Sequence, residues 1–351
     1  MSNLGFWKKF HKPIFCLAPM ADVTDCAFRQ IIAKYGQPDI FWTEFVSADG
    51  LAHPKARKKL LIDLKYSENE RPVVAQIFGG KPDNIRKASA FCKELGFDGI
   101  DINMGCPDKS VEKQSAGAAL IKNPKLAQEI IRATKEGGGG LPVSVKTRIG
   151  YNKNEIETWI PALLAEDIAA ITVHLRTRKE MSDAPAHWNL MKRIVEIRDE
   201  MNSKTLIIGN GDVLNLKDAQ KKAKETGCDG IMLGRAIFGN PWLFNNLRSG
   251  YVSKSTDIFL LKNSSCSRQS RSQVFLKHIP SLKEKLQVML EHTKLFEKML
   301  GTHKNFATMK KHYKAYVNGF SGARELRMKL MEAENASQVE KIINDFLKLE
   351  K

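Results

Sequence analysis

The sequence of 351 residues contains no apolar run close to the roughly 20 residues that a membrane-spanning helix needs. This absence argues against an integral membrane protein. The charged stretch KKFHK and the run PIFCLAPMA superficially resemble a secretion signal, but the apolar part is very short and ADVTD follows at once. We therefore interpret this run as a first strand and expect a cytoplasmic protein.

Cysteine is scarce and scattered along the chain. No two cysteines form a CxxC pair, so the sequence predicts neither a zinc site nor a disulfide scaffold. We expect no metal, and most of these side chains should be reduced, buried thiols. The six cysteines are Cys16, Cys26, Cys92, Cys106, Cys228 and Cys266.

Acidic residues are too few to balance the basic ones. The chain has 56 Lys and Arg against 39 Asp and Glu, a formal net charge of +17. From residue 245 to the end, 20 Lys and Arg stand against 10 Asp and Glu. Such an excess attracts polyanions over a Debye length, so nucleic acid is the leading partner class. A basic surface that serves only solubility is the alternative.

Eight continuous apolar runs recur along the first two thirds of the chain, with helical stretches between them. Continuous runs are typical of a parallel sheet covered by helices. The segments 81–96 and 123–140 have helix character and end in glycine. The pattern predicts an α/β fold, a (β/α)8 TIM barrel over residues 1–248, with a doubly wound open sheet as the alternative. The runs begin near Phe15, Phe41, Val73, Gly99, Val143, Ala170, Leu206 and Gly230.

The character of the sequence changes after GNPWLF. Residues 249–280 are rich in Ser, Lys and Arg and predict a linker or insertion. Residues 281–351 have a helical pattern throughout and predict a small all-α helical bundle.

Polar residues stand where nearly every predicted strand ends, and (β/α)8 barrels build their active sites on that face. The last two strands are followed by GNGD and GRA. Glycines there allow backbone N–H groups to approach a phosphate, which commonly binds at this place in such barrels. The sequence thus favours a phosphorylated cofactor, with plain turns as the alternative.

Three further side chains at strand ends are candidates for cofactor binding. Lys146 would place a positive charge in the barrel mouth, where the N1–C2=O edge of a reduced flavin is a suitable partner. Gln76 and His174 could add hydrogen bonds to ring or phosphate. A structural salt bridge for Lys146 and a core histidine for His174 are the alternatives.

Cys106 follows the fourth run, in the segment NMGCP. Gly105 allows the chain to turn sharply out of the strand and Pro107 stiffens the next part of the loop, so the thiol is presented at the loop rim. Its role could be nucleophile or general acid, because no histidine adjacent in sequence identifies an activating base.

These segments together resemble the tRNA-dihydrouridine synthase family. The motifs are LAPMADVTDCAFR, DGIDINMGCP, AGAALI, VSVKTRIGY, ITVHLRTR, IGNGD and GIMLGRAIFGNPW, in order over residues 14–244. MKKHYKAYVNGFSGA resembles the helical tRNA-binding module of the family. The resemblance implies an FMN-bound barrel, NADPH as reductant, and reduction of the C5=C6 bond of particular uridines in tRNA. Asp22 and Leu175 stand where glycine is usual in the family.

The resemblance also implies roles for individual residues. Cys106 matches the proton donor, which gives its proton to C5 of the uracil after flavin N5 has delivered hydride to C6. Asn103, Arg148 and Arg176 are expected at the substrate. The positions expected to bind FMN are Ala18, Pro19, Met20, Gln76, Lys146, His174, Asn210, Gly211, Asp212, Gly234 and Arg235.

The segment KKHYK supplies the expected contacts to the tRNA backbone. Lys310, Lys311, His312 and Lys314 are expected at phosphates, with the rings of Tyr313 and Tyr316 against ribose or bases. A single solvated helix face is the alternative.

Two other functions fit parts of the sequence. An FMN barrel oxidoreductase acting on a free pyrimidine, similar to dihydroorotate dehydrogenases, would not require the basic tail. A catalytically silent RNA-binding protein would not require Cys106 and Lys146. The sequence therefore favours the synthase, which we expect to be a monomer.

Overall fold

The computed structural model of the protein describes residues 3–245 and 280–349. The predicted linker over residues 249–280 lies outside the described residues except for Pro280, and Cys266 lies outside them as well. Within the described ranges, no helix combines the length and the apolar character needed to cross a membrane.

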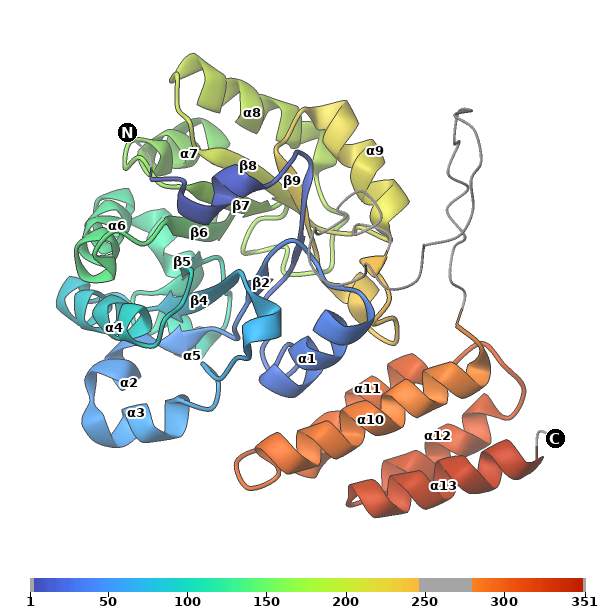
Figure 1. Ribbon diagram of the computed structural model, residues 1–351. Coiled ribbons are helices and arrows are strands. Elements are labelled where there is room, and N and C mark those ends of the chain that lie inside the picture. Colours follow the sequence, from blue (N-terminus) through green and yellow to red (C-terminus); the bar gives the residue numbers. More distant parts are fainter. Residues whose placement is uncertain (1–2, 246–279, 350–351) are drawn as a thin grey trace, which may run out of the picture.

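A barrel of parallel strands forms the larger part of the molecule (Figure 1). Neighbouring strands pair in the order β1-β9-β8-β7-β6-β5-β4-β2, with β3 beside β4. A parallel bridge between Cys16 and Ile40 brings β1 next to the chain that enters β2. The predicted (β/α)8 TIM barrel is confirmed. The strands are β1 (Ile14–Leu17), β2 (Phe41–Trp42), β3 (Val46–Ser47), β4 (Val73–Phe78), β5 (Gly99–Met104), β6 (Val143–Arg148), β7 (Ala170–His174), β8 (Leu206–Asn210) and β9 (Gly230–Leu233).

The strands show why the apolar runs are continuous. Every residue of β1, β4, β5, β8 and β9 is buried, because helices cover the outer face and side chains fill the interior. The second predicted run is divided, since residues 43–45 leave the ladder between β2 and β3. The carboxyl ends of the strands face the same end of the barrel and so bring the residues that follow them together.

Helices alternate with these strands around the barrel. The expected helices over 81–96 and 123–140 are confirmed as α4 and α6. Asn123 caps the first turn of α6 by accepting from the backbone N–H of Leu126, and Gly139, in the left-handed region at φ 50°, ends the helix. The helices are α1 (Cys26–Tyr35), α2 (Ala48–Ala52), α3 (Pro54–Leu60), α4 (Pro82–Glu94), α5 (Lys109–Glu112), α6 (Pro124–Gly138), α7 (Ile156–Leu164), α8 (Met191–Glu200) and α9 (Leu216–Thr226).

The C-terminal region is helical, as predicted, and lies beside α1 (Figure 1). It contains α10 (Leu282–Leu300), α11 (Lys310–Tyr316), α12 (Ala323–Glu332) and α13 (Ala336–Leu349). Ser281 and Glu284 form a capping box at the start of α10. The apolar core of this helical unit includes Cys26, Ala27 and Ile31 of α1, so the unit and the barrel share one packed interface.

His312 requires a correction. Its ring is fully buried, 4.8 Å from the ring of Phe28 on α1 and 4.7 Å from that of His292 on α10. Burial lowers the pKa of His312 to about 3, so the ring is neutral. Tyr313 and Tyr316 are buried on the same face of α11. The predictions that His312 contacts phosphate and that the two tyrosines contact ribose or bases are therefore wrong.

The lysines of α11 lie on its other face. Lys311 and Lys314 are exposed and Lys310 is half-buried. Helical spacing places these lysines on the side of α11 opposite the buried rings. One face of the helix therefore packs against the protein, and the other carries the lysines.

Candidate active site

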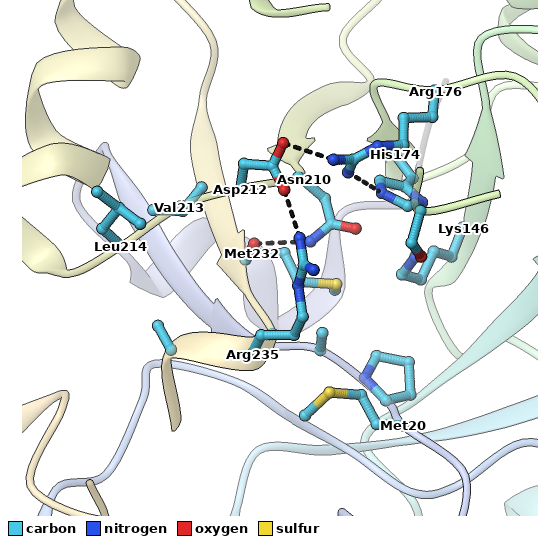
Figure 2. A pocket seen from close by; sticks show the side chains of 16 residues that line it. Met20, Lys146, His174, Arg176, Asn210, Asp212, Val213, Leu214, Met232 and Arg235 are labelled. Atoms are coloured by element: carbon cyan, nitrogen blue, oxygen red, sulfur yellow. Dashed lines mark hydrogen bonds and ion pairs between the residues drawn. The ribbon is translucent and has the colours of Figure 1, made fainter. Parts of the chain in front are cut away.

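A cavity of about 580 Å³ lies at the carboxyl ends of the strands (Figure 2). Its walls come from β6, from the carboxyl-terminal parts of β7, β8 and β9 with the segments that follow them, and from the segment after β1. All residues expected at the cofactor line it, apart from Gln76. They are Ala18, Pro19, Met20, Lys146, His174, Asn210, Gly211, Asp212, Gly234 and Arg235.

Asp212 joins two arginines at one side of the cavity (Figure 2). One carboxylate oxygen accepts from Arg176 Nη2 at 2.5 Å and from the backbone N–H of Ala186 at 2.8 Å, and the other accepts from Arg235 Nη2 at 2.5 Å. Burial opposes the charge of Asp212, but these hydrogen bonds and the two guanidinium groups keep its pKa below the ordinary value. Two cations and one anion leave this side with an excess positive charge.

Arg176, which we expected at the tRNA substrate, is almost fully buried and lines the cavity together with the residues expected at the cofactor. Its Nε donates to the carbonyl oxygen of Ala184 at 2.5 Å, and its Nη2 is held by Asp212. These contacts make Arg176 part of the cavity wall.

His174 is neutral in this environment. Arg176 Nη1 lies 3.1 Å from His174 Nε2, and because a guanidinium can only donate, Nε2 must accept and Nδ1 carries the proton. Burial, together with the charges of Lys146, Arg148 and Arg176, lowers the pKa of His174 to about 2. The ring therefore adds no charge of its own to the cavity.

Lys146 is half-buried and lines the cavity from β6. Its ammonium group has no hydrogen-bond or ion-pair partner among the described residues, so no structural salt bridge is seen there. Burial and the charge of Arg148 lower its pKa to about 8, although Asp101 acts in the opposite direction. An unpaired cation in a recessed site is costly unless a ligand supplies negative charge. This side chain therefore fits an anionic ligand in the cavity.

Gly234 leaves space open between β9 and the opposite wall. A Cβ atom there would lie 3.6 Å from Ala18 Cβ and 3.7 Å from Met20 Sδ, both ordinary contacts with residues that line the cavity. The backbone of Gly234 is thus accessible to a ligand. Together with Lys146 and the excess charge near Asp212, this open space suits an anionic, phosphate-bearing ligand.

Gln76 lies behind the cavity, in the barrel interior. Its Nε2 donates to Asp101 at 2.6 Å, and its Oε1 accepts from Asn103 Nδ2 at 3.1 Å. Asn103 Oδ1 in turn accepts from the backbone N–H groups of Gly105, at 3.1 Å, and Cys106, at 2.9 Å. Burial raises the pKa of Asp101 to about 6. A chain of hydrogen bonds therefore connects the barrel interior to the loop that carries Cys106.

Arg148 holds the same loop from the next strand. Its Nε donates to the carbonyl oxygen of Gly105 at 2.8 Å, and its Nη1 donates to those of Thr177, at 3.0 Å, and Met181, at 2.9 Å. We expected Asn103 and Arg148 at the substrate. In the structure both shape the loop that presents Cys106.

The AGAALI motif packs against Cys106 from the other side. The backbone N–H of Ala118 donates to the carbonyl oxygen of Cys106 at 2.9 Å. Gly117 has φ 61°, and a Cβ atom there would come within 2.7 Å of that oxygen. Glycine is therefore required at this position by close approach as well as by backbone conformation.

The Cys106 thiol is half-buried at the carboxyl end of β5. It does not line the cavity, but its loop leaves β5 beside the β6 residue Lys146, which pairs with Asn103. Burial raises the pKa of the thiol, and the charges of Arg148 and Lys146 oppose that rise only in part. The thiol is thus protonated at neutral pH, which favours a general acid over a nucleophilic thiolate.

The two departures from the family pattern are accommodated differently. Asp22 has φ 54°, in the left-handed region where glycine is favoured. Leu175 is fully buried in the barrel core, and its backbone N–H donates to the carbonyl oxygen of Asn210 at 3.0 Å. Of these two positions, only that of Asp22 has a backbone conformation that favours glycine, which explains why glycine is usual there in the family.

Sequence reasoning missed five residues that line the cavity. Four of them directly follow or face the expected strand-end residues, so a wider window around GNGD and GRA would have included most of them. Ser182 lies in the long loop after β7, where no sequence signal marks it. The missed residues are Ser182, Val213, Leu214, Met232 and Ala236.

The chain is similar to a known protein family and to individual members of it. Residues 16–350 match the family described as Dihydrouridine synthase (Dus). The chain is 38% identical over 344 residues to a protein of Staphylococcus aureus (strain COL) named "Probable tRNA-dihydrouridine synthase", covering 97% of this chain and 95% of that protein. Identity is also 38% over 344 residues with "Probable tRNA-dihydrouridine synthase 2" of Bacillus subtilis (strain 168), covering 97% and 96%.

Among solved structures, a 2-naphthoyl-CoA reductase in complex with 2-naphthoyl-CoA matches with a TM-score of 0.50 at 11% identity. The match covers 67% of this chain and 50% of that one, and it shows likeness of fold alone. The family match and the matches to these two relatives each cover nearly the whole length of the sequence. The chain therefore belongs to the dihydrouridine synthase family, whose members are flavin-dependent oxidoreductases.

Proposed function

We propose that the protein is an FMN- and NADPH-dependent tRNA-dihydrouridine synthase that reduces the C5=C6 bond of uridine. One observation carries the proposal. The ammonium of Lys146, which has no partner among the described residues, lines a cavity at the barrel mouth, and the protonated thiol of Cys106 lies in the loop that follows the adjacent strand β5. A cation for an anionic cofactor and an acid for the substrate thus lie at the carboxyl ends of neighbouring strands.

The residues around the cavity fit FMN by charge and by space. Lys146 would hold the electron-rich edge of the ring, and Arg235 with the backbone of Gly234 would hold the phosphate. When bound, the reduced cofactor supplies a hydride to C6 of the uracil. The neutral His174 and the Arg176–Asp212 ion pair would contact FMN without adding further positive charge to the site.

Cys106 completes the reduction. Adding hydride at C6 leaves a carbanion at C5, which needs one proton. The S–H bond of Cys106 breaks as the C5–H bond forms, and solvent then returns a proton to the thiolate. Asn103 and Arg148 fix the loop so that the thiol faces the reacting base, which must leave its stack to reach the barrel mouth.

Lys310, Lys311 and Lys314 are proposed to contact tRNA phosphates. Replacing all three with alanine should weaken tRNA binding and lower the slope of log K against log salt by about one for each phosphate that is no longer bound. Filter binding at several salt concentrations measures the slope. The control is K87A/K125A, which removes two exposed lysines from α4 and α6, away from the C-terminal helices. An unchanged slope in the triple variant would assign these lysines to solvated surface only.

Gly234→Ala tests the cofactor position. The added methyl group contacts Ala18 and Met20 at ordinary distances, so the protein without cofactor should still fold. The same methyl group takes up space that FMN needs, so FMN affinity should fall about tenfold or more, a cost of about 1.4 kcal/mol. Fluorescence titration with FMN measures the affinity. Full affinity would move the cofactor away from β9.

The proposed function itself is tested with purified protein, NADPH and unmodified tRNA. Dihydrouridine should appear in the tRNA, and NADPH should be consumed in proportion, when nucleosides are counted by mass spectrometry. Free uridine and orotate serve as controls for a small-molecule oxidoreductase. Turnover of a free pyrimidine without turnover of tRNA would replace this proposal with the alternative function.

A further inference from the structure

We propose that Lys304 is a positioning residue, which fixes the helical unit on the barrel mouth so that a bound tRNA delivers its uridine in register. The inference rests on the proposed function and adds to it. Lys304 lies in the segment between α10 and α11, far in sequence from the residues it contacts. No motif in the sequence singles it out.

Lys304 reaches across the interface into a group of barrel carboxylates. Its Nζ lies 2.8 Å from Glu44 Oε2, 3.2 Å from Asp63 Oδ1 and 3.6 Å from Asp22 Oδ1. Only 13% of the lysine side chain and 6% of the Glu44 side chain are exposed. The contact is therefore a recessed ion pair between the two parts of the protein, where solvent screens charge poorly.

The same carboxylate holds a loop of the cavity. Glu44 Oε1 accepts from the backbone N–H of Asp22 at 2.5 Å. Asp22 lies two residues after Met20, whose side chain lines the cavity, and its left-handed backbone turns the loop at this point. Glu44 thus contacts Lys304 with one oxygen and the cavity loop with the other. The helical unit and the cavity loop are thus joined through Glu44 and, at the longer distance of 3.6 Å, directly through the side chain of Asp22.

Another ion pair at this interface is quite different. Lys34 on α1 lies 2.7 Å from Glu291 on α10, but 56% of the lysine side chain is exposed. Exposed ion pairs of this kind contribute little to the free energy of unfolding. The apolar core shared by α1 and the helical unit keeps the two parts attached, while Lys304 is the recessed charge that fixes their orientation at the mouth.

Loss of Lys304 should therefore leave tRNA binding intact but slow the delivery of the bound uridine to the reaction site. The exposed lysines of α11 do not touch Lys304, so tRNA should still bind. The helical unit would no longer be fixed at the cavity loop, so the bound uridine should reach the reaction site less often. A purely structural role would instead lower cofactor content and every activity together.

The test compares Lys304→Met with Lys304→Arg and with Lys34→Met as the matched control. Reduced holoenzyme is mixed anaerobically with saturating tRNA, and its reoxidation is followed by absorbance. Lys304→Met should react about tenfold more slowly, with tRNA affinity within about threefold of wild type and an unchanged rate of reoxidation by oxygen. Lys304→Arg should recover most of the rate, and Lys34→Met should match wild type.

Each other result contradicts the inference. An unchanged rate at saturating tRNA, or a parallel loss of cofactor and of oxygen reactivity, assigns Lys304 to stability. If Lys304→Met does not fold, the double variant K304M/E44Q removes both charges and must show the same selective slowing. A wild-type enzyme that fails to react with tRNA would overturn the proposed function itself, which separates the two failures.

Discussion

Replacing Cys106 with alanine should remove most dihydrouridine formation while the protein keeps its flavin. The thiol is the proposed proton donor to C5, and general acid catalysis is typically worth about 10²–10⁴-fold in rate. Cys106 does not line the cavity, so cofactor content should stay at the wild-type level. Rates with unmodified tRNA and the flavin absorbance of the purified variant measure the two quantities.

The control for this variant is Cys228→Ser. Cys228 is a buried thiol just before β9, at the opposite end of the strands, and its Sγ donates to the carbonyl oxygen of Gly230. A serine hydroxyl can donate in the same way, so turnover should remain near wild type. If Cys106→Ala reacts as fast as Cys228→Ser, the proton comes from another group.

The pH dependence follows from the raised pKa of Cys106. The acid form is the active one, so it is present at low pH and lost as the pH rises through the pKa of the thiol. An ordinary thiol has a pKa of about 8.5. Because burial raises the pKa of Cys106, the rate of the proton-transfer step should stay constant up to a pH above that value and fall only beyond it. A decline that begins near neutral pH would instead indicate an active thiolate or another acid.

Lys146→Met should have the second large effect. The variant removes the cation proposed to face the electron-rich edge of the ring, and a hydrogen bond to a charged group contributes about 2 kcal/mol. That energy corresponds to about 40 mV for a two-electron couple. The midpoint potential of the bound flavin should fall by about this amount, since the lysine favours the reduced, anionic form. Spectroelectrochemistry of the holoenzyme measures the shift.

The same lysine predicts a pH effect on cofactor affinity. Burial lowers the pKa of Lys146 to about 8, so its charge is present below that pH and lost above it. The difference in FMN affinity between wild type and Lys146→Met should therefore shrink as the pH rises through about 8. Lys217→Met, on the exposed surface of α9, should match wild type throughout. A difference that stays constant with pH would mean that Lys146 acts by packing and not by charge.

Much of the barrel could be predicted because its signals are local. Continuous apolar runs, helix caps and closing glycines lie within a few residues of one another, and the strand ends then bring Lys146, Asn210 and Gly234 together through topology alone. The break between β2 and β3 was not predictable, because residues 43–45 lie within one continuous run of the sequence and leave the hydrogen-bonded ladder only in the folded structure.

Three features that the sequence did not predict depend on long-range contacts. His312 was expected at RNA because it stands among lysines, but its burial depends on Phe28 of α1, which lies far away in sequence. Arg176 was expected at the substrate, but Asp212 and the carbonyl of Ala184 hold it in the cavity wall. Lys304 has no local signal at all, since its partners come from three separate barrel segments. Long-range pairing of this kind cannot be read from periodicity or spacing.

The central claim is that one cavity holds the reducing cofactor beside the acid that completes the reaction. Its most direct test is a single anaerobic turnover, in which holoenzyme reduced without excess reductant is mixed with unmodified tRNA. We predict one dihydrouridine formed for each flavin oxidised, with nucleosides counted by mass spectrometry. Flavin that is reoxidised without dihydrouridine in the tRNA, or that stays reduced, would contradict the account.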